Sequence, residues 1–278
     1  MLRFMRNLLQ LPRRASDGSD AVFIGLPKFS ANAPTAQNAL DIFRGHWASD
    51  LSHLVPGTLA GSTNLFVDPR INDDLLRRFA GEDGSLSGQR VLELGPLEGA
   101  HTYQLEQLGA EVTAVEANTE AFFKCLIVKE LLQLRKARFL YGDCLSYLRS
   151  DPGRFDLIVC CGVLYHLENP LELIGLMASH ADRVYLWTHY EPEISAESRK
   201  GVEVTWNGEA YRYFSRNNSG RRLEKYWGGR QARSTRLTRA DLMRACRSVG
   251  FDQVQVHEDN AAHPGGPCIG LSLWRSYP

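Results

Sequence analysis

Two glycines and an acidic residue form the pattern in this sequence that points most directly to chemistry. Gly95 and Gly99 lie in the stretch VLELGPLEG, where an apolar run ends in a turn, and Glu116 ends the next apolar run, roughly 20 residues after Gly95. A glycine turn between a strand and a helix presents backbone N–H groups, and an acidic side chain at the end of the neighbouring strand can accept hydrogen bonds from both ribose hydroxyls. The spacing therefore predicts a site for a nucleoside-containing cofactor.

The turn itself distinguishes between classes of nucleoside cofactor. A dinucleotide site needs the pattern G-x-G-x-x-G so that the backbone can approach a pyrophosphate, whereas Pro96, Leu97 and Glu98 separate the two glycines here. Glu98 would place a negative charge where the pyrophosphate should lie. We therefore expect Glu98 to suit a cofactor with a cationic end.

These residues need strands and helices to position them, and the hydrophobic pattern supplies both. From Arg90 onward, strand-length apolar segments alternate with helical segments, which is typical of βαβ units and a parallel sheet. Strands are predicted over 90–95, 111–116, 137–141, 155–161 and 183–189, and helices near 100–108, 119–134, 143–149 and 169–180. A polar stretch of about 45 residues interrupts the pattern, which resumes with a helix at 237–250 and strands at 251–258 and 268–275.

The composition is that of a soluble globular protein, with 278 residues, 44% of them hydrophobic and 23% charged, and no net charge. The six cysteines lack paired spacing, which predicts reduced thiols and a cytoplasmic location. No apolar run reaches the length of a transmembrane helix. The N-terminal stretch MLRFMRNLLQLPRR is interpreted as a frayed tail rather than a membrane-surface helix or a secretory signal. The histidines lack metal-ligand spacing, so no catalytic metal is expected.

Four segments in order, VLELGPLEG, VTAVEAN, YGDCLSYL and FDLIVCCGVLYHLENP, resemble the successive motifs of class I S-adenosylmethionine-dependent methyltransferases. The resemblance covers about residues 86–190 and 237–276, and GVLYHLENP is similar to the wobble-uridine carboxymethyltransferase group and related small-molecule methyltransferases. It implies S-adenosyl-L-methionine as cofactor. It also implies an α/β fold: a Rossmann-like, seven-stranded, mostly parallel sheet with helices on both faces and its last strand antiparallel. Residues 1–85 are then an N-terminal extension and substrate cap, and 86–278 the methyltransferase domain with a lid insertion at 191–236.

Roles follow from this resemblance for the first two motifs. Glu93, Gly95 and Gly99 match the motif that cradles the methionine portion of the cofactor, and Glu116 matches the acidic residue that binds the ribose. Leu97 stands where the family generally has a glycine. This departure puts the local backbone geometry of the turn in question.

The later motifs imply further cofactor contacts. Asp143 matches the residue that usually accepts a hydrogen bond from the adenine amino group, with Cys144 supplying a neighbouring backbone contact. Asp143 could instead only cap the following helix. Cys161 and Gly162 match positions at the end of the fourth strand, beside the cofactor and facing the substrate.

Methyl transfer is an in-line displacement that needs alignment, plus a base if the acceptor is a hydroxyl. His166 and His189 are the candidate catalytic bases, because both follow strands whose ends should face the substrate cleft. Each also has a structural interpretation, as a helix-start residue and a satisfied strand-end residue. Tyr165, Trp187 and Tyr190 could form an aromatic wall around the acceptor, although core packing explains Trp187 equally well.

The late insertion indicates the acceptor class. Between Arg221 and Arg247 nine basic residues stand against two acidic ones, with aromatic residues interleaved from Tyr211 to Trp227. This pattern favours a small-molecule or sugar-like, anionic acceptor, phosphorylated or lipid-linked, although half of the arginines could simply form a solvated helix face. Two alternatives stay open. A tRNA-modifying methyl- or carboxymethyltransferase is disfavoured by the zero net charge, and a non-catalytic cofactor-binding partner subunit gains weight from Leu97.

Overall fold

The computed structural model describes residues 26, 29–67, 79, 84–218 and 231–276. The chain divides into two units, Met1–Ala33 and Pro34–Pro278, and everything below concerns the second. The basic N-terminal stretch lies outside the described residues. The sequence also predicts a helix from Pro69 to Phe79, and of this segment only Phe79 is described. None of the helices in the described ranges is both long and apolar enough to cross a membrane.

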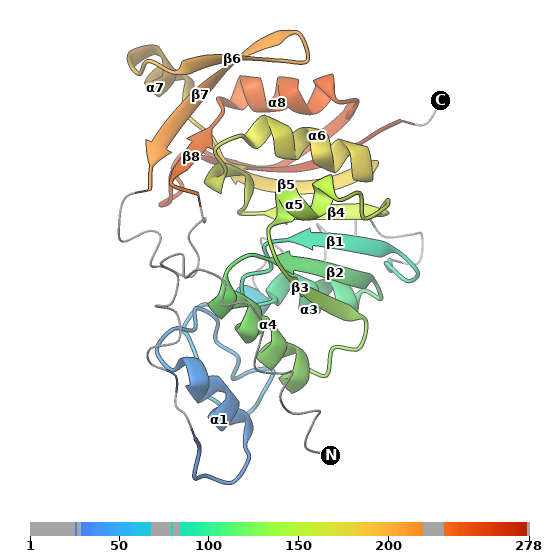
Figure 1. The fold of residues 1–278 in the computed structure, drawn as a ribbon, viewed down its shortest axis with the longest axis vertical. Coiled ribbons are helices and arrows are strands. Elements are labelled where there is room, and N and C mark those ends of the chain that lie inside the picture. The colour runs from blue at the N-terminus through green and yellow to red at the C-terminus, as the bar shows by residue number, and fades with distance from the viewer. Residues whose placement is uncertain (1–25, 27–28, 68–78, 80–83, 219–230, 277–278) are drawn as a thin grey trace, which may run out of the picture. The chain divides into compact units, whose positions relative to one another are not determined.

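A seven-stranded sheet forms the centre of this unit (Figure 1), in the order β3-β2-β1-β4-β5-β10-β9. The β10 strand pairs antiparallel with both β5 and β9, whereas β1 to β5 pair in parallel. This arrangement confirms the predicted fold class. The strands are β1 Arg90–Leu94, β2 Glu111–Glu116, β3 Ala137–Tyr141, β4 Leu157–Cys161, β5 Arg183–His189, β9 Gln253–Asn260 and β10 Cys268–Trp274.

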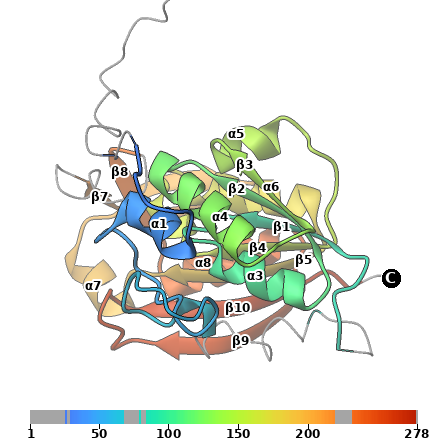
Figure 2. The same ribbon diagram turned by 90° about the horizontal axis from the view of Figure 1, so that it is seen from below.

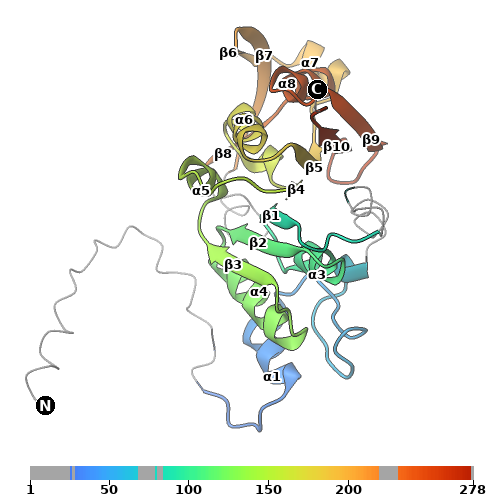
Figure 3. The same cartoon turned by 90° about the vertical axis from the view of Figure 1, so that its right-hand side faces the viewer.

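Helices cover both faces of the sheet (Figure 3), because successive strand side chains point to opposite sides. Leu92 of β1 packs in a core shared with α5, α6 and α8, whereas its neighbour Val91 packs in a second core shared with α3 and α4. The five helices predicted from residue 100 onward therefore form, with boundaries shifted by a few residues. They are α3 Ala100–Gln107, α4 Thr119–Leu131, α5 Cys144–Arg149, α6 Pro170–His180 and α8 Arg239–Ser248, with the short 3-10 helix η4 Leu164–His166 before α6.

The polar stretch after β5 contains structure that the sequence pattern did not predict. It forms α7 Glu193–Ser198 and a separate antiparallel sheet of β6 Val202–Trp206, β7 Glu209–Asn217 and β8 Arg233–Arg236 (Figure 1). Asn207 and Gly208 join β6 to β7 with φ angles of 50° and 80°, the geometry of a tight hairpin turn. Trp206 packs in the core formed with α6 and α8, so the hairpin is attached to the outer side of these helices.

Residues 34–67, called the cap below, precede the sheet and contain α1 Ala36–Leu40, η2 Asp41–Phe43 and η3 Leu65–Val67. The α1 helix begins at the N-cap Thr35, whose side chain accepts a hydrogen bond from the Asn38 N–H. Figures 1 and 2 both show α1 beside α4. The cap is therefore placed next to the second helix of the predicted cofactor-binding motif.

Candidate active site

The glycine turn leaves β1 at the carboxyl edge of the sheet, where open α/β folds bind ligands. Gly95, Leu97 and Gly99 adopt φ angles of 68°, 57° and 80°. A side chain at Gly95 would lie 2.7 Å from the Val163 side chain, so only glycine fits there. Leu97 thus keeps the left-handed conformation that glycine adopts without strain, at a cost of about 1–2 kcal/mol. Its departure from the family pattern therefore adds strain to the turn.

The Glu116 carboxylate meets this turn from the end of β2. It is 8% exposed, and it accepts hydrogen bonds from the Leu97 N–H at 3.2 Å and the Asn118 N–H at 2.7 Å. Burial raises the pKa of Glu116 to about 7, against the opposing effect of these hydrogen bonds. The carboxylate is therefore close to half-ionised at neutral pH.

A buried polar group lies beneath the turn. The Glu93 carboxylate is fully buried and accepts a hydrogen bond from the Thr102 hydroxyl, while His101 Nδ1 lies 3.4 Å from its Oε1. That Oε1 atom has no hydrogen-bond partner among the described residues. Burial alone would lower the pKa of His101, but Cys161 and the Glu93 carboxylate raise it to about 10. Glu93 Oε1 is therefore in ion-pair range of His101, although it accepts no hydrogen bond from the described residues, and this buried anionic group is of the right charge for the cationic methionine end of the implied cofactor.

Glu98 points away from this site, and the expectation that it suits the cationic end of the cofactor is wrong. Its carboxylate accepts hydrogen bonds from the backbone N–H groups of Ala48 and Ser49 in the cap, at 2.9 and 2.8 Å. It also lies 3.3 Å from Lys124 Nζ of α4. Sequence reasoning missed these contacts because they join residues about 26 to 50 positions apart, beyond the reach of local patterns.

Asp143 and Cys144 lie where β3 gives way to α5. Asp143 is the N-cap of α5, and its carboxylate accepts hydrogen bonds from the Ser146 N–H and hydroxyl, both at 2.9 Å. The capping role that the sequence left open is therefore present. Burial raises the pKa of the Cys144 thiol to about 12, so Cys144 can offer its backbone but not a thiolate.

The end of β4 faces a group of ring side chains. Gly162 has a φ of 79°, and its N–H donates a hydrogen bond to the Trp187 carbonyl at 3.0 Å. A side chain at Gly162 would come within 3.7 Å of the Tyr165 hydroxyl. Gly162 and the half-buried Cys161 thus lie between the turn at Gly95 and those rings.

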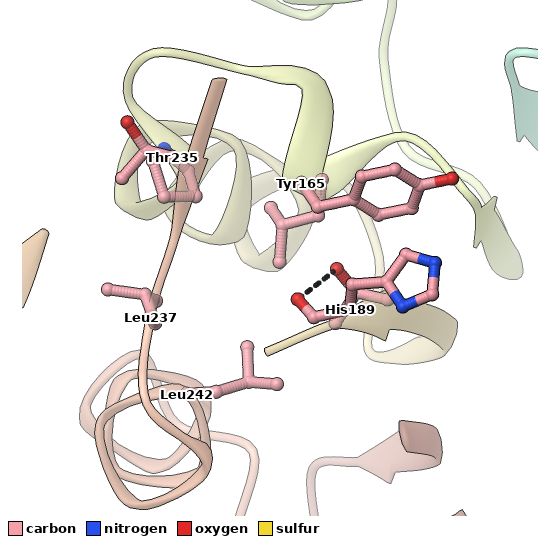
Figure 4. Close-up of a pocket in the computed structure, with 8 residues that line it drawn as sticks. Tyr165, His189, Thr235, Leu237 and Leu242 are labelled. Carbon is pink, nitrogen blue, oxygen red and sulfur yellow. Dashed lines mark hydrogen bonds between the residues drawn. The ribbon is translucent and has the colours of Figure 1, made fainter. Parts of the chain in front are cut away.

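We call the side chains of Tyr165, His166, Trp187, His189 and His263 the ring cluster. The Tyr165 ring lies 4.2 Å from the His166 ring and 4.6 Å from the His189 ring; Figure 4 shows Tyr165 beside His189. Trp187 and His263 lie 5.0 and 5.3 Å from His189. The structure therefore brings both predicted catalytic histidines to one place.

Hydrogen bonding fixes the protonation pattern of His189. Its Nδ1 lies 3.1 Å from the Pro267 carbonyl oxygen, and because a carbonyl only accepts, Nδ1 must carry the hydrogen. Burial lowers the pKa of His189, and the nearby charges of Arg236 and His263 add to this effect. The ring is consequently neutral at pH 7, with the lone pair on Nε2.

Tyr190 and His263 are both placed differently from what their sequence positions suggest. Tyr190 is buried in the core, and its hydroxyl donates to Asp259 at 3.0 Å, so it does not join Tyr165 and Trp187 in one wall. His263 belongs to the segment HPGGPC, whose glycines and prolines by themselves indicate only a turn. Because β10 runs antiparallel, the turn before it lies at the carboxyl edge of β5, and that topological rule could have placed His263 in the site.

The predicted basic patch is only partly visible. Arg236 of β8 is 8% exposed, and its guanidinium donates to the Gly265 carbonyl at 3.3 Å beside the ring cluster. Arg239 and Arg244 pair with Asp259 and Asp241 at 2.6 Å on α8, as a solvated helix face would. Arg233 and Arg247 are exposed. Six further residues of the predicted patch lie outside the described residues: Arg221, Arg222, Lys225, Tyr226, Trp227 and Arg230. Within the ranges that are described, no group of three His, Cys, Asp or Glu side chains could hold a metal ion.

Comparison with curated proteins gives partial matches. The chain is 26% identical over 114 residues to the ubiquinone biosynthesis O-methyltransferase of Pseudoalteromonas translucida (strain TAC 125), covering 40% of this chain and 47% of that protein. It is 30% identical over 95 residues to the protein of the same name from Xanthomonas campestris pv. campestris (strain B100), covering 34% and 39%. The matched region thus spans less than half the length of these relatives.

Solved structures share the fold over more of the chain. The N-terminal domain of EvdMO1, crystallised with SAH and D-fucose, aligns with a TM-score of 0.65 and 24% identity over 87% of this chain and 95% of that chain. An S-adenosylmethionine-dependent methyltransferase from Clostridium acetobutylicum ATCC 824 aligns with a TM-score of 0.50 and 12% identity, over 76% and 93%. A family model described as "Methyltransferase domain" matches residues 65–256, most of the sheet and its helices. The chain therefore belongs to the methyltransferase-domain family, and it is an S-adenosyl-L-methionine-dependent methyltransferase.

Proposed function

We propose that this enzyme methylates a hydroxyl group of a small-molecule or sugar-like, anionic acceptor, with His189 as the general base. The observation that carries the proposal is the hydrogen bond from His189 Nδ1 to the Pro267 carbonyl. It leaves Nε2 as a proton acceptor, and the lowered pKa keeps that atom unprotonated at neutral pH. S-adenosyl-L-methionine supplies an electrophilic methyl group on a sulfonium.

The proposed cofactor position uses the predicted residues. Glu93, Gly95 and Gly99 would hold the methionine portion, and the buried negative charge of Glu93 beneath the turn supports this placement. Glu116 would accept hydrogen bonds from the ribose hydroxyls at the end of β2. Asp143 would reach the adenine amino group.

Two other contacts complete this position. The Cys144 backbone would lie beside the adenine, next to Asp143 at the start of α5. Cys161 and Gly162 would line the path between the methyl group and the acceptor, because Gly162 lies between the turn and the ring cluster. The absence of a side chain at Gly162 leaves room there, since a Cβ would meet only the Tyr165 hydroxyl.

The ring cluster would orient the acceptor. In-line displacement depends on holding the attacking oxygen close to the methyl group and excluding water. The Tyr165 and Trp187 rings lie beside His189 in T-shaped contacts, and such aromatic surroundings suit a sugar or aromatic ring. His166, on the other side of Tyr165, is the second candidate base.

Three observations support the acceptor class. The buried Arg236 guanidinium beside the cluster would favour an anionic group such as a phosphate or a carboxylate. The curated relatives are named O-methyltransferases, which is consistent with a hydroxyl acceptor. The EvdMO1 domain has been crystallised with D-fucose, which is consistent with a sugar.

A paired substitution tests the base. We expect His189→Gln to lower kcat about 10²- to 10⁴-fold while leaving the dissociation constant of S-adenosylhomocysteine unchanged. His166→Gln serves as the matched control and should lower kcat much less. A larger loss in His166→Gln than in His189→Gln would transfer the role to His166, and no loss in either would refute general-base catalysis.

An acceptor screen tests the substrate class. Phenols and sugars should be assayed as pairs that differ only in a phosphate or carboxylate group. Preferred methylation of the charged member, lost in Arg236→Gln, is the expected result. Equal activity on the uncharged member would contradict the anionic part of the proposal.

We also propose that the enzyme works in the cytoplasm. None of the six cysteines, all of which lie in the described ranges, forms a disulfide, which suits a reducing compartment. Fractionation of cells that express the tagged full-length chain, with measurement of the thiol state, tests this location.

A further inference from the structure

A buried cation connects the cap to the cofactor motif. Lys124 of α4 has no exposed side-chain surface, which is rare for a lysine unless it is paired. Its Nζ lies 3.3 Å from Glu98 and 2.9 Å from Glu120 and donates to the His46 carbonyl at 2.5 Å. Lys124 thus connects the turn, α4 and the cap.

Aromatic side chains of the cap enclose the same cation. Lys124 Nζ lies 5.4 Å from the Trp47 ring centre and 5.8 Å from the Phe43 ring centre, within cation–π range. Trp47 is itself fixed, because its Nε1–H donates to the Leu40 carbonyl at 2.8 Å. The cap therefore supplies a shaped pocket for the Lys124 ammonium group.

The Glu98 carboxylate completes the connection from the other side. Its two oxygens accept separate hydrogen bonds from the backbone N–H groups of Ala48 and Ser49, and it is 1% exposed. We call Glu98, Lys124, Glu120 and the backbone of residues 46–49 the latch. A buried ion pair of this kind contributes little net stability compared with apolar packing. We therefore expect the latch to have a role beyond stability.

That role follows from the position of Glu98 in the chain. Glu98 lies between Leu97, whose φ of 57° is strained, and Gly99, which leads into α3. Strained residues persist at functional sites only where surrounding contacts determine them. The Leu97 N–H faces Glu116 and the Leu97 carbonyl accepts from the Cys125 thiol at 3.4 Å, while the latch fixes the next residue.

We propose that Glu98 and Lys124 are positioning residues through which the cap holds the Gly95–Gly99 turn in its cofactor-binding geometry. This inference rests on the proposed placement of the cofactor at that turn. Neither residue needs to touch the cofactor. By thermodynamic linkage, cofactor binding must then stabilise the contact between the cap and the turn to the same extent.

Calorimetric titration with S-adenosylhomocysteine tests whether the latch supports cofactor binding at the turn. Glu98→Gln replaces one acceptor oxygen by an NH2 group that opposes a backbone N–H, so we expect the dissociation constant to rise about tenfold. Glu106→Gln is the matched control, because Glu106 also accepts three backbone N–H bonds, from Arg135, Lys136 and Ala137, away from the turn. An unchanged dissociation constant in Glu98→Gln, or an equal rise in Glu106→Gln, would overturn the proposal.

A double variant separates positioning from folding. Glu98→Gln combined with Lys124→Met leaves no unpaired charge within the Glu98–Lys124 pair, so it should recover stability relative to Lys124→Met alone. The dissociation constant should stay raised, because the two cap N–H groups still lack their carboxylate. Recovery of both quantities together would reduce the latch to a purely structural feature.

Hydrogen exchange tests the linkage between cofactor binding and the contact of the cap with the turn. A purely structural latch would not make amide exchange in the cap depend on the cofactor. S-adenosylhomocysteine should slow exchange of the Ala48 and Ser49 amides in the wild-type protein and have no effect on them in Glu98→Gln. Cofactor-independent exchange in the wild type would refute the proposal.

Glu116→Ala tests the cofactor position separately. If this variant binds S-adenosylhomocysteine normally, the placement of the cofactor at the turn is wrong. If Glu116→Ala loses binding while Glu98→Gln binds normally, the placement holds and the latch proposal is rejected.

Discussion

Burial controls the charge of the Glu116 carboxylate, and this has consequences for both stability and binding. Its pKa of about 7 lies above the value of 4.5 for a free glutamate. The folded state therefore binds more protons than the unfolded state between these values, and stability falls as the pH rises through that window. The hydrogen bonds from the Leu97 and Asn118 N–H groups partly offset the cost of burying the ionised form.

Replacement of Glu116 by glutamine should remove this pH dependence. We expect the free energy of unfolding of the wild type to fall by about 2–3 kcal/mol relative to Glu116→Gln between pH 4.5 and 8, and the variant to bind S-adenosylhomocysteine at least tenfold more weakly. Urea unfolding at both pH values and calorimetry would measure these effects. A parallel pH dependence in the two proteins would show that Glu116 does not titrate in this range.

The same reasoning predicts the pH profile of the reaction. Burial lowers the pKa of His189, so its protonated form should be lost below the usual histidine value. We expect kcat/KM to rise with pH along an acid limb centred below 6.5 and to be flat through pH 7, with this limb absent in His189→Gln. An acid limb that persists unchanged in the variant would assign the titration to another group.

At the scale of elements, the sequence pattern predicted the strands of the seven-stranded sheet. Strands β1, β4 and β5 are largely buried apolar runs, and those patterns are local. The β6–β7 hairpin was missed because β6 is largely exposed, so it lacks a hydrophobic run. The Asn207–Gly208 pair was the available signal. The latch and His263 could not be predicted from local pattern, because both depend on contacts between distant segments.

The hairpin gives a prediction at this scale. Gly208 has a φ of 80° and open space around its Cα, so Gly208→Val introduces backbone strain without a clash. We expect a loss of about 1–2 kcal/mol in the free energy of unfolding, with cofactor affinity unchanged because the hairpin packs on α6 and α8. Asn207→Gly is the control and should be close to neutral. A fall in cofactor affinity would mean that the hairpin takes part in the site.

At the scale of the whole molecule, charge separates the small-molecule proposal from a tRNA-modifying role. The chain has no net charge, and Arg239 and Arg244 of α8 are paired with carboxylates at 2.6 Å. Proteins that bind nucleic acid need basic groups available to phosphates, and their affinity falls steeply as salt rises.

We therefore expect unmodified tRNA to bind weakly at physiological salt and to leave the methylation of a small-molecule acceptor uninhibited. Titration of fluorescent tRNA between 50 and 200 mM salt measures this, because each phosphate contact adds about 0.9 to the slope of log affinity against log salt for a duplex. A slope near zero is the expected result, since paired arginines release few counterions. Tight binding with a slope of several units, reduced by Arg236→Gln but not by Arg244→Gln, would instead place RNA at the ring cluster and favour the tRNA-modifying role.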